Sequence, residues 1–363
     1  MLVVLGFGGI VAARDLLITT YPGHKSQNVG DNLISHSAME LVRSRCLSYN
    51  PEIIFREDSL DAYVHSPART ILAPGFSVSN GTYPKLFRLF SDLNDLDKFS
   101  PIGCSFQHPV PCHDSFDSYC FDESTLNFLR RVADLCGDDG IPCRDMLIEN
   151  LLQSHGVNSY YCGDLGLFEE KFVGSDFIPP SNIRSIVFTI QHHHSRFDEQ
   201  ARILLALLEK RFQGCRKFIA FHSKPGKLSE ALAQYAGSLG FETLHMHGDV
   251  SNLSLYESID LHVGYRLHGH ITFLRKRKPS VLLIEDCRSF GFSNSGDFGV
   301  GCFDALNCQT MLGFSETPFR VMDYLERQIS AGFVDYGSTF DLIDKTYLTA
   351  VSPFFDRFCS LLK

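Results

Sequence analysis

The stretch from Asp260 to Arg288, DLHVGYRLHGHITFLRKRKPSVLLIEDCR, constrains the fold of this chain more than any other. It reads as a short apolar strand, a turn that carries Arg266 and His268, an amphipathic helix that starts near Gly269, a stop at Pro279 and a second apolar strand. A strand, helix and strand in this order form a parallel pair, and ligands of open parallel sheets bind outside the carboxyl ends of the strands. The stretch therefore predicts the fold class and also the edge of the sheet at which a site lies.

The turn at Arg266 has the composition of an anion site. The first N–H groups of a helix have no partner inside the helix and carry partial positive charge, so a guanidinium beside them completes a site for a carboxylate or a phosphate. The alternative is structural: Arg266 caps a neighbouring helix or pairs with Asp260, and His268 is a satisfied core histidine. The residues alone leave both interpretations open, although their place at a strand end favours a site.

The length and composition indicate a soluble protein of two domains. The chain has 363 residues, more than one core usually supports, and 44% of them are hydrophobic against 21% charged. A net charge of −9 argues against a nucleic-acid partner, which would require a basic face, but it permits a local cationic pocket. The 12 cysteines are scattered and include no CxxC pair, which favours reduced thiols in the cytosol over a disulfide scaffold.

The opening segment MLVVLGFGGIVAA is apolar but short. It is too short to span a bilayer and lacks a positively charged start, so it is either a poor signal sequence or an extra leading segment. No other stretch approaches the run of about 18 apolar residues that a membrane span requires. We therefore expect a cytoplasmic protein with no transmembrane segment, and the sequence leaves a homo-oligomer open.

Two groups of residues suggest a metal site, and neither has the right spacing. The first group is Cys104, His108, Cys112, His113 and Cys120, whose separations do not match a zinc finger or ribbon. The second is the run of three histidines at 192–194, in which consecutive side chains point in different directions, so a loop or a substrate contact is expected there instead. We expect neither a metal nor a cofactor.

Strand and helix patterns alternate on both sides of a proline-containing break at 174–182, GSDFIPPSN. Before the break we expect strands at 16–21, 53–55, 70–73 and 102–106 and near residues 141 and 160, with helices at 33–45, 83–93, 124–136 and 144–155. After it we expect strands at 185–190, 217–221 and 241–246 ahead of the opening unit, with helices at 198–212, 228–239 and 251–258 and two more beyond residue 317. This alternation predicts an α/β fold with two Rossmann-like domains, 1–178 and 179–363, that face a cleft.

Polar residues follow several of these strands and are candidates for substrate binding. In the first half the loop before the first helix contains Asn28, Gly30 and Asp31, and Asp31 or Asn32 is expected as the N-cap. Taken alone, the same loop is more typical of a plain cap and turn. In the second half the residues that follow strands are Arg196, Ser223, Lys224, Glu285, Asp286 and Arg288.

Four segments of the chain resemble the polysaccharide pyruvyl transferase family. They are NVGDN at 28–32, CRDMLIENLL at 143–152, GDLGLF at 163–168 and GYRLHGHITFLRKRKPSVLLIEDCR at 264–288, and their order and separations match over about residues 15 to 300. One departure is APGF at 73–76, where many members have a glycine-rich turn. Taken together, the four segments are a specific sign of the family, whereas each segment alone is a weak one.

The resemblance implies a glycosyltransferase-B-like fold and a transferase activity. Members of this family move pyruvate from phosphoenolpyruvate onto a sugar of a polysaccharide or glycan, where it forms a cyclic ketal, and phosphate is released. The resemblance also implies that Arg266, Leu267 and His268, which match the family's R-x-H, meet the donor in the second domain, and that the acceptor lies on the first domain. Arg196 is similar in position to a second donor arginine, in a loosely aligned loop.

The expected chemistry assigns roles to these residues. Phosphoenolpyruvate carries a carboxylate and a phosphate, and Arg266, Arg196 and the helix N-terminus supply the positive charge, with Lys224 or Arg288 in reserve. His268 is the expected general acid that protonates the enol carbon. Asp31, Glu285 or Asp286 removes the proton of the sugar hydroxyl, and the reaction requires no cofactor beyond phosphoenolpyruvate as co-substrate.

Two other functions are compatible with the sequence. A glycosyltransferase of the same fold could use Glu285, Asp286 and Arg288 to bind the ribose and diphosphate of a nucleotide-activated sugar, and it would bind a nucleotide. The other function is that of a carbohydrate-binding scaffold without catalytic activity. Replacing His268 in such a protein would change no turnover, because there would be none. The polar residues at the strand ends argue against the scaffold, and the sequence does not identify the acceptor sugar.

Overall fold

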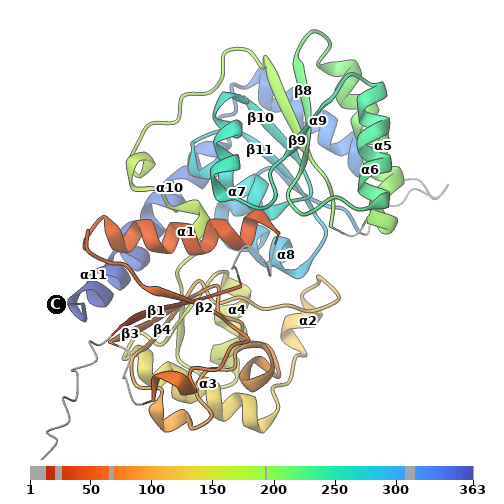
Figure 1. Cartoon of the computed structure of the whole chain (residues 1–363). Coiled ribbons are helices and arrows are strands. Elements are labelled where there is room, and N and C mark those ends of the chain that lie inside the picture. The colour runs from red at the N-terminus through yellow and green to blue at the C-terminus, as the bar shows by residue number, and fades with distance from the viewer. Residues whose placement is uncertain (1–13, 21–26, 65–68, 193, 307–314, 363) are drawn as a thin grey trace, which may run out of the picture.

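The computed structural model describes residues 14–20, 27–64, 69–192, 194–306 and 315–362, which form two α/β units (Figure 1). The first unit contains strands β1 (Asp15–Thr19), β2 (Glu52–Phe55), β3 (Thr70–Pro74), β4 (Phe99–Ile102), β5 (Ile141–Cys143) and β6 (Ser159–Tyr161), and helices α1 (Val29–Arg43), α2 (Asp114–Asp117), α3 (Glu123–Cys136) and α4 (Met146–Ser154). The apolar opening segment lies outside the described residues.

The strands of the first unit pair in parallel, in the order β2, β1, β3, β4. Strands β5 and β6 pair with each other, and a single parallel bridge between Cys104 and Cys143 joins them to the segment that follows β4. A helix lies between β1 and β2, between β4 and β5 and between β5 and β6, so these consecutive parallel strands are joined by helical crossovers, as expected from the sequence pattern.

The second unit begins at β7 (Ser185–Thr189) and continues with α5 (His194–Arg211), β8 (Arg216–Phe221), α6 (Lys227–Ser238), β9 (Glu242–His245), β10 (Leu261–Gly264), α7 (Leu267–Arg275), β11 (Ser280–Ile284), α8 (Cys287–Ser293) and β12 (Cys302–Asp304). Its strands pair in the order β12, β11, β10, β7, β8, β9, and every pairing is parallel. The chain therefore runs outward in both directions from β7 and β10. The carboxyl ends of these two central strands form the switch point at which open α/β sheets bind ligands.

The predicted fold class is confirmed, since both units are parallel, Rossmann-like sheets flanked by helices (Figure 1). The described chain has no helix or strand between Phe172 and Ser185, which spans the proline-containing break at 174–182 and makes this segment the linker between the units. The C-terminal helices are α9 (Thr317–Ser330), α10 (Tyr336–Thr346) and α11 (Ser352–Ser360). Helix α11 returns to the first unit, where Asp356 pairs with Arg45 at 2.7 Å and Phe358 packs edge-on against Tyr49.

Two predicted elements of the first unit are wrong. The helix expected at 83–93 is replaced by short turns, Thr82–Leu86 and Leu93–Asp95, because Tyr83 precedes Pro84 and adopts an extended backbone. The strand expected at 102–106 lies at Phe99–Ile102 instead and includes Pro101. Proline is tolerated there because the side of β4 away from β3 has no long ladder to complete.

The starts of two helices also differ from the prediction. The N-cap of α1 is Asn28, whose Oδ1 accepts a hydrogen bond from the Gly30 N–H at 3.1 Å, and not Asp31 or Asn32. Helix α7 begins at Leu267 rather than Gly269, with Arg266 at the N-cap position. Both shifts place Gly30 and His268 within the first turn of a helix, where N–H groups lack partners inside the helix.

The basic run at 275–278 joins the second unit to the segment before the linker. Arg275 is buried and its Nε lies 3.0 Å from a Glu169 carboxylate oxygen, and the Nε of Arg277 donates to the Phe172 carbonyl at 3.2 Å. These basic side chains therefore hold neighbouring segments of the chain together. Among the described helices none is long and apolar enough to cross a membrane.

Asp145 lies where the two units meet. It is the N-cap of α4, with its side chain accepting a hydrogen bond from the Ile148 N–H at 3.0 Å, and a Cβ at Gly291 of α8 would lie 2.5 Å from a carboxylate oxygen. The side chain is 1% exposed. This burial raises the pKa of Asp145 to about 6.

Asp145 should make the stability of the protein depend on pH. A carboxyl group with a higher pKa in the folded than in the unfolded state binds protons more tightly when folded, so its contribution to stability falls as pH rises from about 4 to about 6. Asp145→Asn keeps an oxygen for capping and removes the charge, so we expect it to be more stable than the wild type at pH 8, by up to about 3 kcal/mol. Urea unfolding from pH 4 to pH 8 measures this gap, and a gap that does not shrink towards pH 4 would contradict the assignment.

Candidate functional site

A pocket of about 530 Å³ lies between the two units. Residues from the first unit and from the carboxyl ends of the second unit's strands line it together: Thr20, Asn28, Asp31, Ile34, Ser35, Arg56, Pro74, Gly75, Ser105, Gln107, His108, Pro109, Arg144, His192, His268, Glu285, Asp286, Cys287 and Arg288. A smaller cavity next to it shares five of these residues and adds Arg266, Leu267, His222 and Tyr265. The cleft predicted from the sequence is thus a polar pocket rich in arginine, histidine and carboxylate side chains.

Arg266 is buried at the N-terminus of α7, and its described partners are neutral groups. Its Nη2 donates to Ser223 Oγ at 2.8 Å and to Asn28 Oδ1 at 3.2 Å, and its Nη1 lies 3.3 Å from His192 Nδ1. Its backbone N–H donates to Thr189 Oγ1 at 3.2 Å. Within the described chain it forms no salt bridge, and burial lowers the pKa of its guanidinium. A buried cation without a paired anion is costly, so an anionic ligand would be favoured here.

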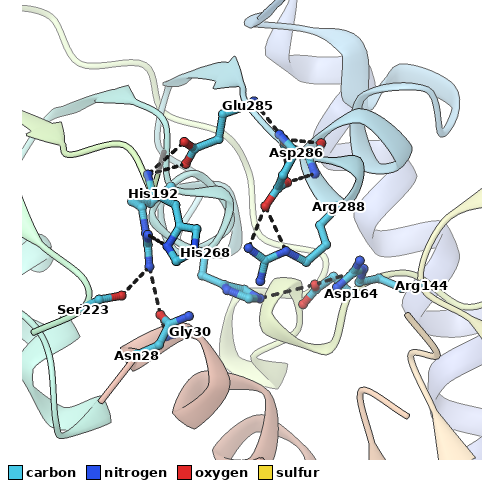
Figure 2. Close-up of polar contacts among 12 residues, drawn as sticks. Asn28, Gly30, Arg144, Asp164, His192, Ser223, His268, Glu285, Asp286 and Arg288 are labelled. Atoms are coloured by element: carbon cyan, nitrogen blue, oxygen red, sulfur yellow. Dashed lines mark hydrogen bonds and ion pairs between the residues drawn. The ribbon is translucent and has the colours of Figure 1, made fainter. Parts of the chain in front are cut away.

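His268, in the first turn of α7, lies between groups from both units. Figure 2 shows its ring between Asn28 and Ser223 on one side and Asp164 and Arg144 on the other. Its Nε2 is 3.6 Å from Asp164 Oδ2. The pKa of Asp164 is lowered, because the interaction with His268 and the positive charge of Arg144 outweigh burial, which acts to raise it. Asp164 is therefore a carboxylate at neutral pH and orients the imidazole.

Gly30 allows this histidine to approach α1. A Cβ built on Gly30 would lie 2.0 Å from His268 Nδ1, far inside any tolerated contact. The ring therefore packs directly on the first turn of α1, next to the N-cap Asn28. Only glycine fits at this position without displacing the ring.

Glu285, Asp286 and Arg288 follow β11 and line the pocket, but their charges are engaged. Both carboxylate oxygens of Glu285 accept hydrogen bonds from the His192 N–H, at 2.9 and 2.8 Å. Asp286 Oδ2 accepts from Arg288 Nη2 at 2.6 Å, and Asp286 caps α8. The pKa of Asp286 lies well below its ordinary value because Arg288 and the Ser289 N–H outweigh burial.

The structure brings together ten of the twelve residues that the sequence singled out. Asn28, Asp31, His268, Glu285, Asp286 and Arg288 line the larger pocket, Arg266 and Leu267 line the adjoining cavity, Gly30 packs on His268, and Ser223 accepts a hydrogen bond from Arg266. The structural alternative of an Arg266–Asp260 pair is not observed, since Asp260 instead accepts from the N–H groups of Arg184 and Ser185.

Two predicted residues are not part of this group. Arg196 lies in the first turns of α5 with an exposed side chain over the Phe197 ring, 5.7 Å from the ring centre. Lys224 is exposed in the loop after β8. Neither lines the pocket or the adjoining cavity. In both cases a position soon after a strand was a correct signal for location near the sheet edge, but it could not give the direction of the side chain.

Sequence reasoning missed three charged residues of the site: Arg56, Arg144 and Asp164. Arg56 follows β2 directly, so the rule that ligands meet the carboxyl ends of strands could have found it. Arg144 and Asp164 lie in the segments at 143–152 and 163–168 that carry the family resemblance, but nothing in those segments assigns their roles. Within the described residues no group of three or more His, Cys, Asp and Glu side chains is arranged to hold a metal ion, and His193 lies outside them.

The fold and site together define a two-unit α/β protein with a polar interdomain pocket at the switch point of its second sheet. No family model and no curated protein matches the sequence. Several solved structures match at the level of the fold. The accessory secretory protein 1, 2 and 3 structure of Streptococcus pneumoniae is 11% identical, with a TM-score of 0.42, over 84% of this chain and 56% of that one.

Two more solved structures are similar. A structure of a mutant S. aureus TarM in complex with Fondaparinux, alpha-GlcNAc-glycerol and UDP is 12% identical, with a TM-score of 0.45, over 83% of this chain and 57% of that one. The UDP-GlcNAc 2-epimerase of Methanocaldococcus jannaschii is 8% identical, with a TM-score of 0.45, over 86% of this chain and 91% of that one. The chain thus spans little more than half the length of the first two, and at such identities the likeness concerns the fold alone.

Proposed function

We propose that this protein is a transferase that acts on a sugar, and that it moves pyruvate from phosphoenolpyruvate onto two hydroxyls of a glycan as a cyclic ketal. The observation that carries the proposal is the buried Arg266 at the start of α7, without a described ion pair, next to the His268–Asp164 pair. This is a site for an anion beside a proton donor, which is what an enol phosphate requires.

The donor phosphate fits at the N-terminus of α7. There Arg266 and the N–H groups of Leu267 and His268, which have no acceptor inside the helix, offer positive charge and donors. Arg288 adds charge from the other wall of the pocket, and its pKa is raised by Asp286, so it stays a cation. These groups would bind the donor and stabilise the phosphate as it leaves.

His268 would protonate the methylene carbon of the enol, which makes C2 electrophilic. A sugar hydroxyl then bonds to C2, the C2–O bond to phosphate breaks, and the second hydroxyl closes the ketal. Of the two hydroxyl protons, one replaces the proton that His268 gave and the other leaves with phosphate. Asp31 is the proposed base, because it lines the pocket from the first turn of α1, in the unit on which the acceptor is expected.

A second candidate is a glycosyltransferase that uses a nucleotide-activated sugar. The observation in its favour is the group of Glu285, Asp286 and Arg288 at one wall of the pocket, which could bind a ribose and a diphosphate. Against it, the described residues that line the larger pocket have aromatic rings only at His108, His192 and His268, and none of them is a Phe, Tyr or Trp on which a nucleobase could stack.

Phosphate release from phosphoenolpyruvate, measured with a panel of galactosides, glucosides and N-acetylhexosaminides, tests the proposal. We expect release that depends on a sugar, and Arg266→Met should weaken donor binding about 10- to 100-fold because a charge-assisted contact is lost. Arg196→Met is the matched control, an exposed arginine outside the pocket, and should leave donor binding unchanged. If no phosphate were released, and a nucleotide sugar but not phosphoenolpyruvate raised the thermal stability of the protein, this proposal would be refuted and the glycosyltransferase supported.

A further inference from the structure

Arg144 is a buried cation of the first unit that lacks adequate partners. It directly follows β5, is 7% exposed and lines the pocket. Its Nε and Nη2 atoms have no hydrogen-bond partner among the described residues. Its nearest described carboxylate oxygen is Asp164 Oδ2, 3.9 Å from Nε, which is too long for a hydrogen bond. Buried polar groups are almost always satisfied, so these donors indicate a ligand.

The position of Arg144 relative to His268 indicates the chemical class of this ligand. Asp164 Oδ2 is 3.6 Å from His268 Nε2 and 3.9 Å from Arg144 Nε, so the guanidinium lies just beyond the proposed acid. Arg266 contacts Asn28 and Ser223, which lie on the opposite side of His268 (Figure 2). A molecule that reacts at His268 therefore has a buried arginine on either side, one from each unit.

We infer that Arg144 forms a second anion subsite, which binds the carboxylate of the donor while Arg266 binds its phosphate. This inference rests on the proposed donor. The carboxylate and the phosphate of phosphoenolpyruvate are both attached to C2, so a molecule held by both arginines would place C2 and the methylene carbon near His268. A guanidinium has five N–H donors, so Arg144 can keep its attraction to Asp164 and still bind a ligand carboxylate with its remaining edge.

The subsite makes a prediction for the wild-type protein alone. Inorganic phosphate should bind at Arg266 and pyruvate at Arg144, so the two should bind at the same time. Isothermal titration of pyruvate into protein saturated with phosphate should give the affinity found without phosphate. Pyruvate that is displaced completely by phosphate would overturn the inference, because it would place both anions in one subsite.

Variants separate the two subsites. Arg144→Met should weaken the binding of pyruvate and raise the KM for phosphoenolpyruvate about 10- to 100-fold, with inorganic phosphate binding unchanged, and Arg144→Lys should recover part of the loss. Arg130→Met, an exposed arginine of the same unit on α3, is the control for loss of charge. An Arg144→Met enzyme with a normal KM for phosphoenolpyruvate and a raised KM for the sugar would overturn the inference in favour of an anionic acceptor.

The outcome also distinguishes this inference from the proposed function. A wild-type protein that binds no phosphoenolpyruvate refutes both. A wild-type protein that binds phosphoenolpyruvate, with affinity unaffected by the loss of Arg144, refutes the subsite alone and leaves the proposed function standing on Arg266 and His268.

Discussion

His268→Ala is expected to lower kcat for sugar-dependent phosphate release by about 10²- to 10⁴-fold, the usual contribution of a positioned general acid. The substitution removes the imidazole that lines the pocket next to Asp164. Donor affinity should change much less, because Arg266 and the start of α7 remain. Steady-state kinetics that separate kcat from KM measure the effect.

Two further variants make this result specific. His245→Ala removes an exposed histidine of β9, outside the pocket, and should leave kcat unchanged. Asp164→Asn keeps the shape of the carboxylate but not its charge, and it should lower kcat, because the imidazole loses the carboxylate that orients it. Full activity in His268→Ala would exclude this histidine as the acid and favour a binding role for the site.

The layer structure of the second unit could be predicted from the sequence because its strands are short apolar runs buried on both faces. In β7, β10 and β11 every residue is buried, and such runs between amphipathic helices define a parallel sheet. The first unit was harder to predict. Pro84 and Pro101 interrupt its patterns in opposite senses, one by preventing a helix and the other by lying inside a strand.

Local sequence patterns could predict which residues follow the strands of the sheet, but not which of them contact each other in the site. Arg266 and His268 follow β10, and their position at the end of a central strand located the pocket. The contact of His268 with Asp164 joins residues 104 positions apart, from different units, and no local pattern can pair them. The direction of a side chain after a strand is set by the loop, and for this reason Arg196 was included and Arg144 was not.

Gly30→Ala is expected to cost about 10²-fold in kcat, although it adds one methyl group to a helix. The new Cβ would lie 2.0 Å from His268 Nδ1 and 2.7 Å from Cγ, so the ring must move, and a displacement of about 1 Å at a reacting group costs about this much. Alanine favours a helix over glycine, so the loss should not come from unfolding of α1. Because the ring also contacts Asp164, the shift should lower kcat more than donor affinity.

The matched control for this prediction is Gly237→Ala in α6, where an added Cβ meets no atom within 4 Å. It should raise helix stability slightly and leave kcat unchanged. Kinetics and thermal unfolding of both variants separate the two effects. Full activity in Gly30→Ala would show that the imidazole can move without loss of catalysis. The close packing of His268 on α1 would then contribute to the fold and not to the reaction.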